Sequence, residues 1–304
     1  MPEVTPDATA PASDESAYQD RWWRAPDGLR LHARDYAGGA GVARLPVICI
    51  HGLTRNAADF EVIAPLIARS GRRVLAVDVR GRGRSERAPD PMTYRPDTYA
   101  KDILALMDQA GIARAVFLGT SMGGLITMAL SALRLKAIAA VIMNDVGPEV
   151  APEGLARIAA YTGKAVEINS WADAVAYARS VNAVAFPHYE DAQWQAFARR
   201  IFTEDEAGVP RLDYDPDISA PIRAAGGKAL VPNLWPWFTR MARRRPLLVV
   251  RGQTSDLLSP AIAARMKKRA RDMELVEVPG IGHAPMLDEP EARAAIFEFL
   301  GRVP

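Results

Sequence analysis

The chain has 304 residues, of which 49% are hydrophobic and 24% charged, and its formal net charge is +2. These values are typical of a globular protein with a large buried core, and they exclude a disordered, collagenous or coiled-coil chain. Cys49 is the single cysteine. An intramolecular disulfide and a metal site built on paired thiolates are therefore excluded, which favours a reducing, cytoplasmic environment.

Residues 1–20 contain five acidic residues, no Lys or Arg, and no apolar periodicity. Such a segment cannot bury enough apolar surface to offset the entropy of ordering, so we predict a flexible acidic tail. The N-terminus has no basic head followed by an apolar stretch, and the chain has no run of about 18 uncharged apolar residues. We therefore expect neither a secretory signal nor a membrane span.

Basic residues are scattered along the chain without a nucleic-acid-binding signature. They include the groups Arg80, Arg82, Arg84 and Arg87, and Arg243 to Arg245. Such runs usually lie on solvated helix faces and loop ends, so no nucleic-acid partner is expected.

The elements after the tail begin with an alternating hairpin. Trp22 to Arg24 and Leu29 to Tyr36 flank the turn signal Pro26-Asp27-Gly28. Continuous apolar runs then predict buried strands at 46–50, 73–79, 115–118, 137–143, 247–250 and 275–278. Amphipathic spacing predicts helices at 57–70, 98–110, 122–133, 259–271 and 289–300. This alternation predicts an α/β fold with a mostly parallel, doubly wound sheet.

The alternation is interrupted once, between Asp145 and about Arg245. Ser170 can cap a helix over 171–180, and Trp194, Phe197 and Ile201 share one helical face. We therefore predict a helical insert at 146–245, with a core made of 21–145 and 246–304.

The strand ending at Leu118 runs into Gly119-Thr120-Ser121-Met122-Gly123 and then a helix. This is the Gly-x-Ser-x-Gly nucleophile elbow, in which a strained turn exposes the serine oxygen above the sheet and the glycines avoid clashes. Ser121 is therefore the candidate nucleophile.

Serine needs an adjacent base at neutral pH. The chain has four histidines, and His283 follows the last predicted strand, at the same carboxyl edge of the sheet as Ser121. His283 is thus the candidate base. His51 is expected to shape the loop after the strand 46–50, His32 to be a surface or packing residue, and His188 to be an exposed loop residue.

The imidazole needs a carboxylate to fix its tautomer. Asp256 follows the strand 247–250 and completes the order Ser, Asp, His, so it is the expected acid. Asp145, after the strand 137–143, is the competing candidate. The oxyanion donors are expected to be the backbone N–H groups of Met122 and Leu53.

These motifs resemble the α/β-hydrolase family, in its branch of cap-bearing serine esterases, lactonases and C–C hydrolases. The resemblance spans about residues 25–302 and rests on five segments: 51–53, 78–85, 119–124, Asp256 and 282–285. It implies an α/β-hydrolase fold in which residues 146–245 form a helical cap. Relatives that hydrolyse haloalkanes or epoxides carry an aspartate at the elbow, so Ser121 makes those activities unexpected.

The resemblance and the residues together predict a serine hydrolase that cleaves esters or lactones of a small, largely apolar molecule through an acyl-enzyme. No metal or organic cofactor is expected. A C–C hydrolase of a ring-cleavage diketone, an acyltransferase and a non-catalytic ligand receptor are the alternatives. Trp235 and Trp237 are candidate substrate-binding residues of the cap, although they could equally pack the cap on the core.

Overall fold

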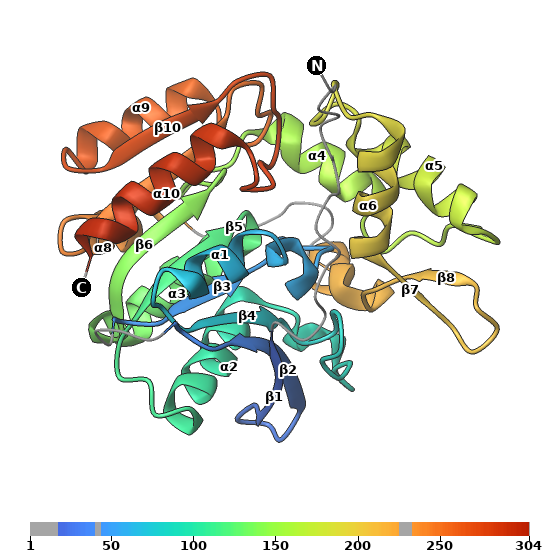
Figure 1. The fold of residues 1–304 in the computed structure, drawn as a ribbon, viewed down its shortest axis with the longest axis horizontal. Helices are drawn as coiled ribbons and strands as arrows, with labels where there is room; N and C mark the ends of the chain where they lie inside the picture. Colours follow the sequence, from blue (N-terminus) through green and yellow to red (C-terminus); the bar gives the residue numbers. More distant parts are fainter. Residues whose placement is uncertain (1–17, 40–43, 225–232, 304) are drawn as a thin grey trace, which may run out of the picture.

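The computed structural model describes residues 18–39, 44–224 and 233–303. The described residues form an eight-stranded central sheet with the order β1-β2-β4-β3-β5-β6-β9-β10 (Figure 1). β1 and β2 form an antiparallel hairpin, β2 pairs antiparallel with β4, and the remaining pairs are parallel. The bounds are β1 Gln19–Arg24, β2 Arg30–Tyr36, β3 Val47–Ile50, β4 Val74–Asp78, β5 Ala115–Thr120, β6 Ile138–Asn144, β9 Leu247–Gly252 and β10 Glu274–Val278. The predicted mostly parallel, doubly wound sheet is confirmed.

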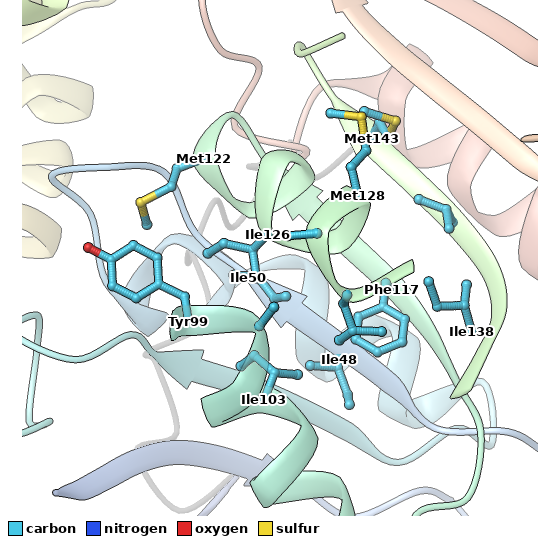
Figure 2. Close-up of a cluster of buried hydrophobic side chains, with 14 of the residues drawn as sticks. Ile48, Ile50, Tyr99, Ile103, Phe117, Met122, Ile126, Met128, Ile138 and Met143 are labelled. Atoms are coloured by element: carbon cyan, nitrogen blue, oxygen red, sulfur yellow. The ribbon is translucent and has the colours of Figure 1, made fainter. Parts of the chain in front are cut away.

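Helices cover both faces of this sheet. α2 and α3 pack over one face, while α1 and α10 pack over the other. Figure 2 shows the first layer, in which side chains of α2 and α3 such as Ile103 and Ile126 meet Ile48 of β3 and Phe117 of β5. Covering on both faces explains why β3, β4, β6 and β9 are buried along their whole length. The bounds are α1 Ile63–Arg69, α2 Pro96–Gln109, α3 Met122–Arg134, α9 Pro260–Arg269 and α10 Pro290–Arg302.

The N-terminal boundary differs from the predicted one. β1 begins at Gln19, so the last two residues of the predicted tail belong to the sheet. Contacts of Asp20 explain the early start, because its Oδ1 lies 2.9 Å from Nε2 of the buried His32 on β2 and 2.5 Å from Nη1 of Arg84. Residues 1–17 of the predicted tail lie outside the described residues.

The segment between β6 and β9 forms the insert, but it is not purely helical. A hairpin of two three-residue strands follows α6, and strands this short carry too little alternation to be visible in the sequence. Figure 1 shows α4, α5, α6 and this hairpin gathered on one side of the molecule. The elements between β6 and β9 are α4 Pro152–Tyr161, α5 Trp171–Asn182, α6 Asp191–Ile201, β7 Phe202–Glu204, β8 Pro210–Leu212, α7 Ala220–Ala224 and, packed on the core, α8 Trp235–Ala242.

The end of the insert also differs from expectation. α8 packs against α3, and its Phe238 and Met241 are fully buried in the same cluster as the α2 and α3 side chains. The core therefore resumes at α8, before the predicted boundary at residue 246. None of the helices in the described ranges is long and apolar enough to cross a membrane.

Two of the arginines expected at solvated loop ends are buried. Arg80 is 1% exposed and forms ion pairs with Asp27 and Asp102, both at 2.7 Å. Arg82 is completely buried. Both side chains are enclosed because the loop after β4 folds back between α2 and the insert. In this loop the backbone of Arg82 pairs with that of Tyr214 in an isolated antiparallel β-bridge.

Candidate active site

Ser121 lies in the turn that joins β5 to α3. Its backbone has φ 51° and ψ −114°, which is a strained conformation for a residue with a side chain. The turn is held because the N–H of Ser121 donates to the carbonyl of Asn144 at the end of β6 (2.9 Å). A Cβ on Gly123 would lie 2.0 Å from the carbonyl oxygen of Ile50, so only glycine allows α3 to start this close to β3. The predicted strand-turn-helix elbow is therefore present.

His283 brings Ser121 and a buried carboxylate together. Its Nε2 is 2.9 Å from Oγ of Ser121, and its Nδ1 is 2.9 Å from Oδ2 of Asp145. The second oxygen of Asp145 accepts from the N–H of Gly252 (3.1 Å), and the side chain is fully buried. A carboxylate held in this way fixes the Nδ1–H tautomer and leaves Nε2 facing the serine as a proton acceptor.

The expectation that Asp256 is the carboxylate of His283 is wrong. Asp256 instead binds Arg157 of α4, with Oδ2 2.6 Å from Nε and Oδ1 2.9 Å from Nη2. Burial alone would raise the pKa of Asp256, but its bonds to Arg157 outweigh this effect and lower the pKa. Both aspartates follow a strand at the same edge of the sheet, so the sequence does not reveal which of them the loop of His283 reaches.

The expected oxyanion donors lie on either side of Ser121. Met122 is the first residue of α3, so its N–H has no acceptor within the helix. Leu53 belongs to the loop after β3 and lines the same pocket as Ser121. The assignment of these two N–H groups as oxyanion donors stays a prediction.

Arg82 is a residue near this site that the sequence reasoning missed. Its Nε donates to the carbonyl of Leu53 (3.0 Å), its Nη2 lies 3.7 Å from Sδ of Met122, and its Nη1 donates to the Tyr99 hydroxyl (3.0 Å). The buried guanidinium thus contacts both residues that carry the expected oxyanion donors. The only signal in the sequence is its place in a glycine-rich turn directly after a buried strand.

His51 holds the loop of Leu53 from the other side. Its Nδ1 is 2.7 Å from the carbonyl of Gly52, and its Nε2 accepts from the N–H of Val79 (3.0 Å). Burial lowers the pKa of His51 to about 4, so the ring is neutral at neutral pH. Both ring nitrogens are occupied by backbone groups, which fits the expected loop-shaping role.

The other two histidines lie outside the group around Ser121. His32 is buried, with Nδ1 2.7 Å from Asp78 and Nε2 2.9 Å from Asp20, and His188 is exposed. No group of three or more His, Cys, Asp or Glu side chains that could hold a metal ion occurs within the described ranges.

A pocket opens over Ser121 and His283, and the insert supplies one of its walls. α4, α5 and α6 each contribute side chains to it. The lining mixes apolar and polar groups. The insert side chains are Ile158, Tyr161, Tyr177, Val181, Asn182, Phe186, Phe197, Ile201, Leu212 and Tyr214.

Trp235 and Trp237, the candidate substrate-binding residues, do not line this pocket. Nε1 of Trp235 donates to Glu149 (3.0 Å), and its ring packs edge-on against Phe238 with centroids 5.9 Å apart. Trp237 is partly buried against the same core cluster. Both lie on α8, which packs against α3, so they serve core packing and the expectation of substrate contact is corrected.

Comparison with known proteins gives consistent matches over most of the chain. A model of the alpha/beta hydrolase family matches residues 47–296. The 3-hydroxybutyrate-oligomer hydrolase of Cupriavidus necator is 34% identical over 281 residues, which cover 90% of this chain and 94% of that protein. The 2-(acetamidomethylene)succinate hydrolase of Mesorhizobium japonicum is 28% identical and covers 78% of this chain and 81% of its own. The crystal structure of an alpha/beta hydrolase from Novosphingobium aromaticivorans has 47% identity and a TM-score of 0.88, covering 94% of this chain and 99% of its own.

Proposed function

The chain belongs to the alpha/beta hydrolase family, and from this premise we propose that it is a serine hydrolase that cleaves carboxylic esters or lactones of a small substrate through an acyl-enzyme. The observation that carries the proposal is the unbroken hydrogen-bond relay from Ser121 through His283 to the buried Asp145. A ligand-binding protein without catalysis has no need for a base held against a strained serine.

In the first half of the proposed reaction, Oγ of Ser121 attacks the ester carbonyl and Nε2 of His283 takes its proton. Asp145 stabilises the imidazolium that forms and keeps its orientation. The N–H groups of Leu53 and Met122 bind the oxyanion of the tetrahedral intermediate. Collapse of the intermediate breaks the ester C–O bond, and His283 returns the proton to the departing alcohol.

In the second half, a water molecule attacks the acyl group on Ser121. His283 again acts as the base, and the second tetrahedral intermediate releases the acid and restores the Ser121 hydroxyl. The insert shields these steps from bulk water, which strengthens the electrostatic interactions of His283 with its partners.

The choice of an ester as the scissile bond is supported by the relative from Cupriavidus necator, which is named as a hydrolase of 3-hydroxybutyrate oligomers. Short oligoesters of hydroxy acids are therefore the first natural compounds to test on this protein. The polar groups among the apolar pocket walls suit substrates of this kind.

The test is covalent labelling with a fluorophosphonate, followed by intact mass. Such a probe reacts only where the serine, its base and the oxyanion donors are assembled, so we expect one label per wild-type chain and none on Ser121→Ala. We expect Ser121→Ala to lose p-nitrophenyl ester turnover by at least about 10³-fold and to keep its Tm within a few degrees. A folded wild-type protein that takes no label would contradict the proposal and favour a receptor.

A further inference from the structure

Arg55 is a pocket residue that the proposed reaction does not use. It follows Leu53 and Thr54 in the loop after β3, and it lines the same pocket as Ser121. Gly52 separates the two side chains, because a Cβ built on Gly52 would lie 3.7 Å from Cβ of Ser121 and 3.4 Å from Cγ of Arg55. The guanidinium contacts Asp59, Met286 and Phe197, all of which line this pocket.

The guanidinium is held rigidly at one side. Nε and Nη2 donate to Asp59 at 2.9 Å and 2.5 Å, and Cζ lies 4.1 Å from the ring centroid of Phe197, which also lines the pocket. Within the described ranges, Nη1 makes no hydrogen bond, and it keeps accessible surface. Two N–H donors of a fixed group are thus left available at the pocket wall.

The charge balance of the pocket wall indicates which substrate groups these N–H donors can bind. Among the described pocket residues, Arg55 and Asp59 are the charged pair beside His283, so the wall near Arg55 is formally neutral. A substrate carboxylate placed here would lose its hydration and would lie near the carboxylate of Asp59. The charge of Arg55 is already paired with Asp59, so no free positive charge would offset these costs. Apart from Ser121 and His283, the remaining polar lining consists of neutral hydroxyl and amide groups, namely Thr54, Thr120, Asn182, Tyr161, Tyr177 and Tyr214.

We infer that Nη1 of Arg55 donates to an uncharged oxygen of the substrate, such as a second ester carbonyl, placed several bonds from the carbonyl that Ser121 attacks. The inference rests on the proposed function and deepens it, since it makes esters that carry a second neutral oxygen the preferred substrates. Arg55 is then a specificity-determining residue that selects the substrate and takes no part in proton transfer.

The experiment compares three p-nitrophenyl esters of matched length: the heptanoate, the 4-acetoxybutanoate and the monoester of adipic acid. They present an alkyl chain, a neutral carbonyl and a carboxylate at about the same distance from the scissile bond. For the wild-type protein we expect kcat/KM to be highest with the 4-acetoxybutanoate, about ten- to a hundredfold above the heptanoate.

The variant for comparison is the double substitution Arg55→Met with Asp59→Leu, which removes the donors and leaves no unpaired carboxylate. We expect its kcat/KM for the 4-acetoxybutanoate to fall to about that for the heptanoate, so that the preference between the two esters is lost. Asp59→Asn is the matched control that keeps Arg55 but frees its charge, and it should raise kcat/KM for the adipate monoester alone.

Two results would overturn the inference. An equal loss with the heptanoate and the 4-acetoxybutanoate would give Arg55 a purely structural role, and a wild-type preference for the adipate monoester would make the site an anion site. Calorimetric binding of N-methyl-4-acetoxybutanamide against N-methylheptanamide checks Arg55 without turnover when both proteins also carry Ser121→Ala, since the acetate ester of the first ligand then stays intact. Failure of the fluorophosphonate label would instead count against the proposed reaction, so the two failures are distinguishable.

Discussion

At the scale of single residues, the decisive contact is the one between His283 and its carboxylate. Asp145 is fully buried and uses both oxygens, one for Nδ1 of His283 and one for the N–H of Gly252. Asp256 lies close enough to His283 for their charges to interact, but its oxygens are occupied by Arg157. The two aspartates therefore have separate roles, one at the imidazole and one at the junction of α4 with the core.

Substitution of the two aspartates tests this division. Asp145→Asn keeps the shape of the side chain but removes the charge that stabilises the imidazolium and fixes its tautomer, so we expect kcat to fall by about 10³- to 10⁴-fold. Asp256→Asn removes the ion pair with Arg157 and a weaker charge interaction with His283 but leaves Asp145 in place, so we expect kcat to stay within about tenfold of wild type. Steady-state hydrolysis of p-nitrophenyl acetate measures both, with circular dichroism as the control for folding. A larger loss of kcat in Asp256→Asn than in Asp145→Asn would instead make Asp256 the carboxylate that orients His283.

At the scale of elements, three loops at the carboxyl edge of the sheet meet around the expected oxyanion donors. The loop after β3 carries Leu53, the loop after β4 carries Arg82, and the turn after β5 carries Ser121 and Met122. Arg82 joins all three loops, because it contacts the carbonyl of Leu53 and the sulfur of Met122 from its own buried position. We therefore expect it to act as a positioning residue for the oxyanion donors.

Replacement of Arg82 tests this positioning. Arg82→Met should release the carbonyl of Leu53 and lower kcat about 10- to 100-fold with KM changed less than about threefold, because oxyanion contacts form mainly in the transition state. Affinity for an alkyl boronic acid, which mimics the tetrahedral intermediate, should fall in parallel. Arg82→Lys keeps the charge without the forked geometry and serves as the variant least prone to misfolding. An increase in KM alone would mean that Arg82 only shapes the substrate pocket.

At the scale of the whole molecule, the insert is docked on the core through polar contacts as well as apolar ones. Asp213, directly after β8, accepts from Nδ2 of Asn56 (2.7 Å), the residue that caps the short helix after the β3 loop. Burial raises the pKa of Asp213 to about 7, and the nearby charge of Asp78 adds to this effect, while Asn56, Arg34 and Arg87 oppose it. This carboxyl links the stability of the insert–core junction to pH.

The sign of this link follows from the two pKa values of Asp213. Between about pH 4 and pH 7 the unfolded chain has lost the proton that the folded chain keeps, so the contribution of Asp213 to stability falls as pH rises and is constant above about pH 7. Asp213→Asn keeps the acceptor for Asn56 but does not ionise. We expect its Tm to equal that of wild type near pH 4 and to exceed it by a few degrees at pH 8, by differential scanning calorimetry. A Tm difference independent of pH would contradict this assignment.

Much of the fold follows from patterns that are local in the chain. Continuous apolar runs identified the six parallel strands, and Pro26-Asp27-Gly28 identified the first hairpin, since both signals depend only on residues close in sequence. The elbow at Ser121 is local for the same reason: strand, glycines and helix are contiguous. His283 was identified because the carboxyl ends of parallel strands necessarily meet at one edge of the sheet.

The remaining features depend on which distant segments pack together. The pairing of His283 with Asp145 depends on the path of the loop that carries His283, which lies 138 residues after Asp145 in the chain. The burial of Arg82 depends on contacts from the insert. The core position of Trp235 depends on α8 packing against α3, which no pattern within α8 reveals. The amino-acid sequence thus determined the sheet and the elbow at Ser121, because periodicity and turn chemistry are local, and strand order along the chain was enough to indicate His283 as the candidate base. Tertiary packing decided the acid, the pocket wall and the place of the tryptophans, because each depends on the meeting of segments far apart in the chain.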